Sequence, residues 1–212
     1  MKSQADRVLE TIIVRKLQKT GISICSEESG ILKITGDNKL RWIVDPLDGT
    51  VNFVRRLGSC GVSISLCQDD TPLWGVIGEY PSGKISWGGP GRGAFQDGKP
   101  LRVSSLSKRS QAILCTGFPA RFNFDNSSLS WIKKTFSSFG KIRMLGSASL
   151  SLLQVAKGSA EAYSENNIMF WDVAAGLAIL EGAGGLYRKT KSRHPGAFNI
   201  KACNGVSSFL IL

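Results

Sequence analysis

The sequence predicts a mixed fold in which an α+β half, rich in antiparallel strands, precedes an α/β half. One observation is an amphipathic helical pattern over Ser3–Thr20, followed by short apolar runs of strand length. A second is the alternation of strand and helix patterns that begins at Ala112, which is typical of layered α/β domains. A third is size, because 212 residues with 42% hydrophobic content can bury a sizeable core. We place the boundary near Ser105–Arg109, which gives subdomains 1–106 and 107–212 of one compact unit.

The first half begins with the helix, whose apolar residues recur every three or four positions and predict one buried face. The apolar runs after it predict strands, and Asp97-Gly98 predicts a hairpin turn between two of them. The core candidates on the helix are Val8, Leu9, Ile12 and Leu17. The predicted strands are Gly21–Cys25, Leu40–Val44, Val62–Leu66, Leu73–Tyr80, Ile85–Trp87, Ala94–Gln96 and Leu101–Ser104.

The second half alternates between the two kinds of element, and its helical runs are more apolar than the first helix. We predict helices over Leu129–Phe139 and Ser147–Lys157, and a third that opens at Trp171 and ends at Gly184-Gly185. The predicted strands are Ala112–Thr116, Lys141–Leu145 and Ala160–Tyr163, with two more near Leu186 and Ile200.

The amino-acid content and the length of the apolar runs exclude several classes of protein. No apolar run is long enough to cross a membrane, and no signal-peptide pattern follows Met1. Five cysteines without a Cys-x-x-Cys pair predict reduced core thiols in a cytoplasmic protein. The single histidine, His194, follows the basic run Arg188–Arg193 and is expected at the surface. Histidine-based nucleophilic mechanisms are therefore not expected.

The formal net charge of +11 is spread along the chain. A basic surface attracts anions and also binds nucleic acid weakly at low salt. The basic residues are not interleaved with aromatic residues as on an RNA-stacking surface. We therefore interpret them as a solvated face and expect neither a nucleic-acid partner nor a membrane.

The most informative motif is Asp45-Pro46-Leu47-Asp48-Gly49-Thr50, which follows the apolar strand ending at Val44. Pro46 fixes the backbone where the strand stops, so Asp45 and Asp48 project from a rigid bend. Two fixed carboxylates suit Mg²⁺, which prefers oxygen ligands in octahedral geometry. Thr50 can open a helix whose exposed N–H groups would attract an anion.

Two distant acidic motifs could converge with this one. Ser26-Glu27-Glu28-Ser29-Gly30 follows the strand over Gly21–Cys25, and Asp172 lies in the first turn of an apolar helix. Each of the three motifs sits at the edge of a regular element. Together they predict a cluster of carboxylates that binds metal.

In this order and spacing the motifs resemble the inositol monophosphatase family, within the superfamily of lithium-sensitive and fructose-1,6-bisphosphatase-like sugar phosphatases. The resemblance runs from about Lys2 to the C-terminus. It also includes Ala5-Asp6, Gly91–Phe95 with Gly98-Lys99-Pro100, Gly146-Ser147-Ala148, and Glu165 seven residues before Asp172. It implies the layered αβαβα sandwich of sugar phosphatases, with the site between two halves that form one catalytic unit. One departure is Ser26, where the family usually has glycine.

The resemblance also implies a role for each matching residue. The metal ligands would be Glu27, Asp45, the Leu47 carbonyl, Asp48 and Asp172, with Asp45 and Asp48 shared between ions. The catalytic residues would be Glu27 and the pair of Asp6 and Thr50, which would orient and deprotonate the attacking water. Substrate would be held by Asp48, by the amides of Gly49 and Thr50, and by Ala148 and Glu165, which meet its hydroxyls. Glu28 is interpreted as a supporting or surface acid.

The expected function is hydrolysis of inositol monophosphate, or a similar small sugar or polyol phosphate, by a water activated by Mg²⁺. Fructose-1,6-bisphosphatase, histidinol-phosphatase and bisphosphate nucleotidase are the alternatives within the superfamily. The alternative from another class is a noncatalytic basic module that binds RNA or a protein. A homodimer is left open. The family normally has one more helical segment before Lys2, so we expect either a short member or an incomplete start, with a frayed first helix.

Overall fold

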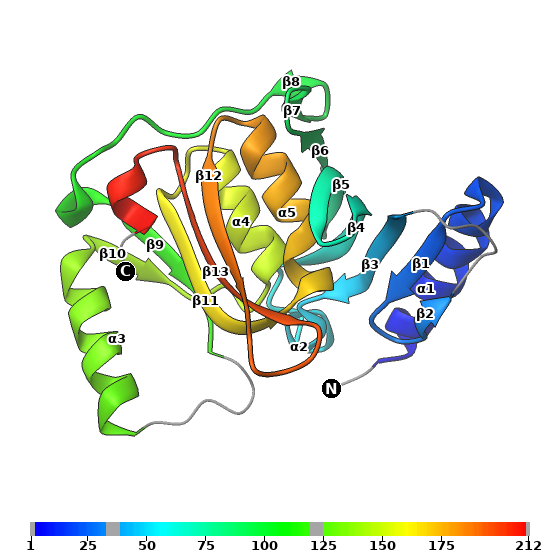
Figure 1. Ribbon diagram of the computed structural model, residues 1–212, viewed down its shortest axis with the longest axis horizontal. Helices are drawn as coiled ribbons and strands as arrows, with labels where there is room; N and C mark the ends of the chain where they lie inside the picture. The colour runs from blue at the N-terminus through cyan, green and yellow to red at the C-terminus, as the bar shows by residue number, and fades with distance from the viewer. Residues whose placement is uncertain (1–2, 33–38, 119–124, 211–212) are drawn as a thin grey trace.

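The computed structural model describes residues 3–32, 39–118 and 125–210 (Figure 1). Its strands form one sheet of eight and another of five, in the orders β2-β1-β3-β4-β5-β6-β7-β8 and β10-β9-β11-β13-β12. The first sheet draws its strands from residues 23–100 and the second from residues 113–203. The division of the chain into subdomains 1–106 and 107–212 remains a prediction.

The eight-stranded sheet is antiparallel except for one pair. β1 runs parallel to β3, with Ser26 opposite Val44, so the two strands end at the same edge. The Asp97-Gly98 turn takes positive φ at both residues, 48° and 81°, as a tight hairpin requires. The elements of this half are α1 Gln4–Leu17, β1 Ser23–Ser26, β2 Gly30–Leu32, β3 Leu40–Asp48, α2 Thr50–Val54, β4 Cys60–Gln68, β5 Thr71–Tyr80, β6 Ile85–Gly89, β7 Gly93–Gln96 and β8 Lys99–Pro100.

The five-stranded sheet is mixed. β9 is parallel to both of its neighbours, β10 and β11, whereas β13 runs antiparallel to β11 and β12. The parallel strands are connected through helices, as the alternating sequence pattern predicted. The elements of this half are β9 Ile113–Thr116, α3 Asn126–Ser138, β10 Lys141–Arg143, α4 Ala148–Ala156, β11 Ala162–Met169, α5 Phe170–Gly182, β12 Leu186–Lys191 and β13 Ala197–Cys203, with a 3-10 turn at Ser207–Leu210.

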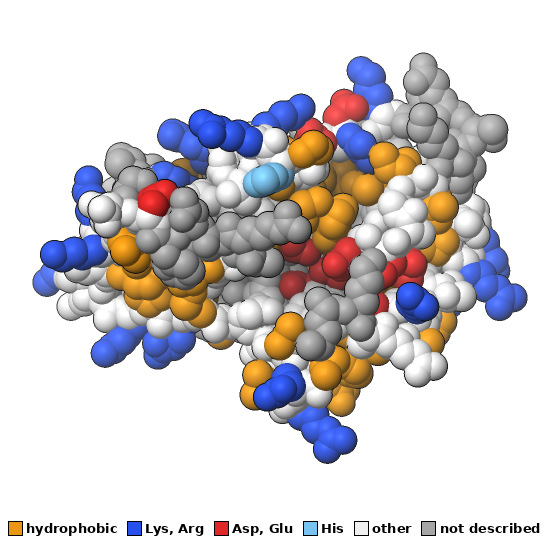
Figure 2. All heavy atoms as spheres, turned by 90° about the horizontal axis from the view of Figure 1, so that it is seen from below, with side chains coloured by type: hydrophobic (Ala, Val, Ile, Leu, Met, Phe, Trp, Pro, Cys, Tyr) orange, Lys and Arg blue, Asp and Glu red, His pale blue; other side chains and the backbone are white. Residues whose placement is uncertain are grey.

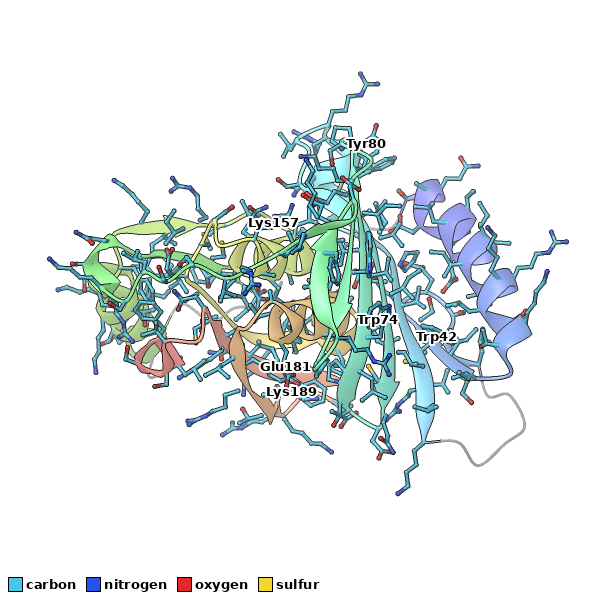
Figure 3. All side chains as sticks on the ribbon, turned by 90° about the horizontal axis from the view of Figure 1, so that it is seen from above. Trp42, Trp74, Tyr80, Lys157, Glu181 and Lys189 are labelled. Carbon is cyan, nitrogen blue, oxygen red and sulfur yellow. The ribbon has the colours of Figure 1, made fainter. Side chains whose placement is uncertain are left out.

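The helices and sheets stack in five layers (Figure 1). α4 and α5 lie between the sheets, α1 lies against the first sheet, and α3 is at the opposite end of the molecule from α1. The main core forms around the two inner helices, where Leu152 and Leu177 are fully buried. Lys157 follows α4 and pairs with Glu79 of β5 at 2.7 Å, which links the middle layer to the first sheet (Figure 3). The predicted αβαβα layering is confirmed.

The prediction that the apolar residues of α1 enter the core is wrong. Val8 and Ile12 are 51% and 50% exposed, Leu9 and Leu17 are half-buried, and the buried residue of this helix is Asp6. Amphipathic spacing identifies an apolar face, but the face is buried only if another element covers it. In the described part of the chain α1 contacts β3 and β1 along one side.

The predicted strand over Leu101–Ser104 is also wrong. Leu101 donates its N–H to the carbonyl of Ala94 at 2.8 Å, and Val103 donates to Ala183 at 3.2 Å. These partners lie in different elements, so the segment crosses from the sheet to the end of α5 without forming a ladder. Strand β2, by contrast, was not predicted, since its three residues are too few to show a pattern.

The expectations for the cysteines and the histidine agree with the structure. All five cysteines are free thiols, and four of them are buried. His194 is exposed. Among the described helices, none is both long and apolar enough to span a bilayer.

Candidate metal centre and adjoining cavity

The central feature of the site is the end of β3, which carries both Asp45 and Asp48. The prediction that the strand stops at Pro46 is wrong, because β3 continues through Pro46 to Asp48. Residues three apart on a regular strand point to opposite faces. Between Asp45 and Asp48, however, β3 has one residue more than its partner β4, because Asp45 pairs with Ser63 and Asp48 with Gly61. Such a bulge re-aims a side chain. Both carboxylates therefore point to the same face of the sheet, at the edge where β3 ends.

Glu27 reaches this edge from the neighbouring strand. It directly follows β1, and its N–H donates to the carbonyl of Val44 at 3.1 Å. The parallel pairing of β1 with β3 therefore places Glu27 beside Asp45.

Asp172 comes from the first turn of α5. The hydroxyl of Ser63 on β4 donates to the carbonyl of Trp171 at 3.2 Å, which holds the start of the helix against the first sheet. As a result, Glu27, Asp45 and Asp172 each offer a carboxylate oxygen, and these oxygens all lie within 4.8 Å of one another. Figure 2 shows the acidic side chains gathered in a hollow on one face of an otherwise basic protein.

The electrostatics of this cluster favour a cation. Burial raises the pKa of Asp45 and Asp172 well above the usual range for aspartate, and the neighbouring carboxylates raise both further. Burial likewise raises the pKa of Glu27. A cation between like charges stabilises their ionised forms, and a donor set made only of carboxylates suits a hard divalent ion. These residues thus fit a metal such as Mg²⁺.

Asp48 lies beside this group but faces α4. Its Oδ2 accepts hydrogen bonds from the Ser147 hydroxyl and the Ser149 N–H, both at 2.7 Å. Ser147 is also the N-cap of α4 and accepts a bond from the Leu150 N–H. Sequence reasoning had included Ser147 in a motif without a role and had missed Ser149. One helix start therefore orients an acid that lies about a hundred residues away in sequence, which no local pattern reveals.

Asp6 and Thr50 form the pair that the resemblance implied. The Thr50 hydroxyl lies 2.9 Å from Asp6 Oδ1 and 3.0 Å from the carbonyl of Leu47. Burial raises the pKa of Asp6, but hydrogen bonds from Ser3 and Thr50 outweigh this effect, so its pKa falls below the usual value. Asp6 is therefore ionised and oriented at neutral pH.

A contact that the sequence did not suggest holds α1 in place. Glu10 accepts hydrogen bonds from the hydroxyl of the fully buried Ser26 and from the N–H and hydroxyl of Ser29. Ser26 is the position where the resembled family usually has glycine. Here its hydroxyl fixes α1, and with it Asp6, to the loop that carries Glu27.

A cavity of about 390 Å³ adjoins the acidic cluster. Glu165 lies in its wall, and the fully buried Tyr163 donates its hydroxyl to Glu165 Oε2 at 3.0 Å. A Cβ on Gly117 would lie 2.5 Å from the same oxygen, so a larger residue there would displace the Glu165 carboxylate. Burial raises the pKa of Glu165 to about 7. The lining residues are Asp48, Thr116, Gly117, Phe118, Met144, Gly146, Ser147, Ala148, Ser151, Glu165 and Ile168.

The structure thus brings most of the sequence candidates to one region. Gly49, with φ of 85°, makes the turn from β3 into α2, and a Cβ there would lie 3.0 Å from the Ser59 carbonyl. Ala148 and Glu165 line the cavity with Asp48. Glu28 lies outside the group of three mutually close carboxylates.

The fold and the carboxylate cluster together define a layered α/β protein with a candidate metal centre between its sheets. The chain belongs to the inositol monophosphatase family, whose profile matches residues 2–207. It is 36% identical over 187 residues to an inositol-1-monophosphatase of Mesorhizobium japonicum, covering 86% of this chain and 70% of that one. It is 33% identical over 186 residues to a Nus factor SuhB of Xylella fastidiosa, covering 86% and 66%. The solved inositol monophosphatase of Anabaena (Nostoc) sp. superposes with a TM-score of 0.86 at 34% identity, covering 96% of this chain and 82% of that one.

The chain therefore spans about two thirds of the length of these curated relatives. The relatives carry different names at similar identity, so the names alone do not assign an activity. The assignment has to come from the site.

Proposed function

We propose that this chain is a Mg²⁺-dependent phosphatase that hydrolyses inositol monophosphate or a similar small sugar or polyol phosphate monoester. The observation that carries the proposal is the convergence of Glu27, Asp45 and Asp172 within 4.8 Å, beside a cavity lined by Asp48 and Glu165. The first group suits a metal and the second suits a hydroxylated substrate. Membership of the inositol monophosphatase family supports both parts.

Within this proposal, the metal ligands are the carboxylates of Glu27, Asp45, Asp48 and Asp172 and the carbonyl of Leu47. When bound, Mg²⁺ neutralises phosphoryl oxygens and lowers the pKa of water. Asp48 would hold the metal while Ser147 and Ser149 keep its carboxylate oriented through Oδ2.

The remaining residues act on the water and the substrate. Asp6 accepts the hydroxyl proton of Thr50, so a lone pair of Thr50 Oγ1 can accept a proton from the attacking water. The N–H groups of Gly49 and Thr50 hold the phosphate at the start of α2. Ala148 and Glu165 contact substrate hydroxyls in the cavity.

The alternatives are of two kinds. Fructose-1,6-bisphosphatase, histidinol-phosphatase and bisphosphate nucleotidase would use the same metal centre with another leaving group. A noncatalytic partner of RNA or protein is the alternative from another class, and it gains weight because several relatives carry the name Nus factor SuhB. The carboxylate cluster favours the phosphatase, because a binding module has no need for buried acids with raised pKa values.

The test is a phosphate-release screen with and without Mg²⁺. Substrates are inositol monophosphates, fructose-1,6-bisphosphate, histidinol phosphate and adenosine 3′,5′-bisphosphate. Asp172→Asn serves as the metal-site variant and Glu28→Gln as its matched control. We expect Mg²⁺-dependent release that is highest with inositol monophosphate and is lost in Asp172→Asn alone. A different best substrate would select one of the rival phosphatases, and no release from any substrate would refute the catalytic proposal.

A further inference from the structure

A second cavity, of about 380 Å³, shares none of its described lining residues with the cavity that contains Glu165. It is enclosed by β1, β3, the first residues of α5 and the segment that joins β12 to β13. Nothing in the proposed phosphatase reaction uses it. Its lining residues are Cys25, Ile31, Arg41, Ile43, Asp70, Phe170, Trp171, Lys191, Ser192, His194, Pro195, Gly196, Ala197 and Phe198.

The floor of this cavity is aromatic. Phe170 and Phe198 are both buried, with ring centroids 5.2 Å apart and ring planes tilted by 53°. The ammonium of Lys189 lies 4.4 Å and 4.6 Å from the two centroids. Trp171 completes the aromatic lining. Such a floor suits the face or edge of another ring.

The rim of the cavity is basic. Arg41 and Lys191 approach the two oxygens of Asp70 at 3.4 Å and 3.9 Å, and the Lys191 side chain is 82% exposed. Lys189 donates to the backbone carbonyl of Asp70, so three cations contact a residue that carries one negative charge. The surplus of positive charge therefore favours an anionic group at the mouth of the cavity.

The walls of this cavity are continuous with the metal centre. Ile43 stands two residues before Asp45 on β3, and Cys25 stands two residues before Glu27, which directly follows β1. Trp171 directly precedes Asp172. Figure 2 shows hydrophobic side chains in the hollow next to the acidic ones. A ligand in this cavity would therefore contact all three elements that carry the clustered carboxylates.

We propose that this cavity binds a small aromatic anion of one or two rings and that its occupancy is coupled to the metal centre. The ring system lies against Phe170, Trp171 and Phe198, and the acidic group lies beside Arg41 and Lys191. The volume is within the range of small-ligand sites. Because coupling between sites is reciprocal, the ligand changes Mg²⁺ affinity by the same factor by which Mg²⁺ changes ligand affinity.

The experiment uses 2-naphthoate as the anionic probe and 2-naphthylmethanol as the neutral one. Titration calorimetry on the full chain without metal measures both. We expect the anion to bind about tenfold more tightly than the neutral probe, since two cations face one acidic group. The double variant Arg41→Gln, Lys191→Gln should abolish this preference. The double variant Lys141→Gln, Arg143→Gln, which removes the same charge from exposed positions on β10, should keep it.

Two further measurements locate the probe. A titration with Mg²⁺ and inorganic phosphate present should leave naphthoate binding intact but shift its affinity, whereas full displacement would place the probe in the metal centre. Val8→Ser changes the separate apolar cavity of about 340 Å³ beside α1 and should have no effect. Equal affinity for the two probes, no binding, or insensitivity to the Arg41 and Lys191 substitutions would overturn the proposal. An affinity that Mg²⁺ leaves unchanged would overturn the coupling.

Discussion

Replacing Glu165 by Gln is expected to stabilise the metal-free protein at alkaline pH, although the residue belongs to the proposed substrate site. The side chain is 8% exposed, and its burial, with a smaller contribution from the charge of Asp48, disfavours the ionised form. Glutamine keeps the shape and keeps an oxygen that can accept the Tyr163 hydroxyl. The substitution therefore removes a buried negative charge and little else.

The size of the effect follows from the pKa of Glu165, which rises from the usual 4.5 to about 7 in the folded protein. At about 1.4 kcal/mol per pH unit, this difference corresponds to about 3 kcal/mol. Folding raises the pKa of this acid. Between pH 4.5 and about pH 7, the folded state therefore binds more protons than the unfolded state. The wild-type carboxyl therefore does not lower the unfolding free energy below pH 4.5. As the pH rises toward 7, the unfolding free energy of the wild-type protein falls. The advantage of the variant should grow over this window and then level off.

The assay is urea unfolding of wild type and Glu165→Gln in chelator, from pH 5 to pH 8.5. We expect the difference in unfolding free energy to increase with pH by about 3 kcal/mol. Glu181→Gln, at an exposed position of α5, controls for the loss of one carboxylate. A difference that is constant with pH, or one that favours wild type at pH 8, would contradict the buried position and raised pKa of Glu165.

Three further predictions concern the reaction. Chelation should abolish phosphate release, and Mg²⁺ should restore it far better than Ca²⁺, which is larger and less strict in its geometry; full activity in excess chelator, measured by phosphate release, would refute the mechanism. Asp172→Asn should lower turnover by orders of magnitude, while the metal-free melting temperature stays equal or rises because repulsion between carboxylates is relieved. Glu28→Gln should have little effect on turnover. Similar turnover in the two variants would show that the carboxylates are wrongly assigned. Tyr163→Phe removes the donor to Glu165 Oε2 and should destabilise the fold by about 1–3 kcal/mol. It should also raise KM for inositol monophosphate more than it changes kcat for p-nitrophenyl phosphate; equal effects on the two substrates would leave Tyr163 a purely structural role.

The parts of the site that the sequence predicted are those set by local structure. An apolar strand placed Asp45 and Asp48 close to its end, and a first helical turn placed Asp172 at the start of α5. Glu27 and Asp45 follow apolar strand patterns, and Asp172 begins an apolar helix pattern, so each position can be recognised in the sequence. The convergence of Glu27, Asp45 and Asp172 was suggested by their places at the edges of regular elements, and the family resemblance supported it.

What the sequence did not predict depends on contacts between distant segments. Glu10 holds Ser26 and Ser29 from another element, and Ser149 orients Asp48 across the middle of the molecule. The bulge in β3 likewise requires the register of β4, which is absent from the pattern of one strand. The prediction that the apolar face of α1 is buried failed for the same reason, because helical spacing does not show which element covers a helix.

The raised pKa values of the clustered carboxylates connect the stability of the protein with its proposed chemistry. Glu27 and Asp45 belong to the first sheet and its edge, whereas Asp172 belongs to the helix between the sheets. Their repulsion opposes the packing of α5 against β3 and β4 until a cation lies between them. A bound Mg²⁺ would therefore stabilise the contact between two layers as well as the reacting phosphate, by an amount that grows with its concentration relative to its dissociation constant. Metal binding and the packing of the inner helix are then two aspects of one equilibrium, so a substitution that loosens α5 should weaken Mg²⁺ binding even if it leaves every carboxylate in place.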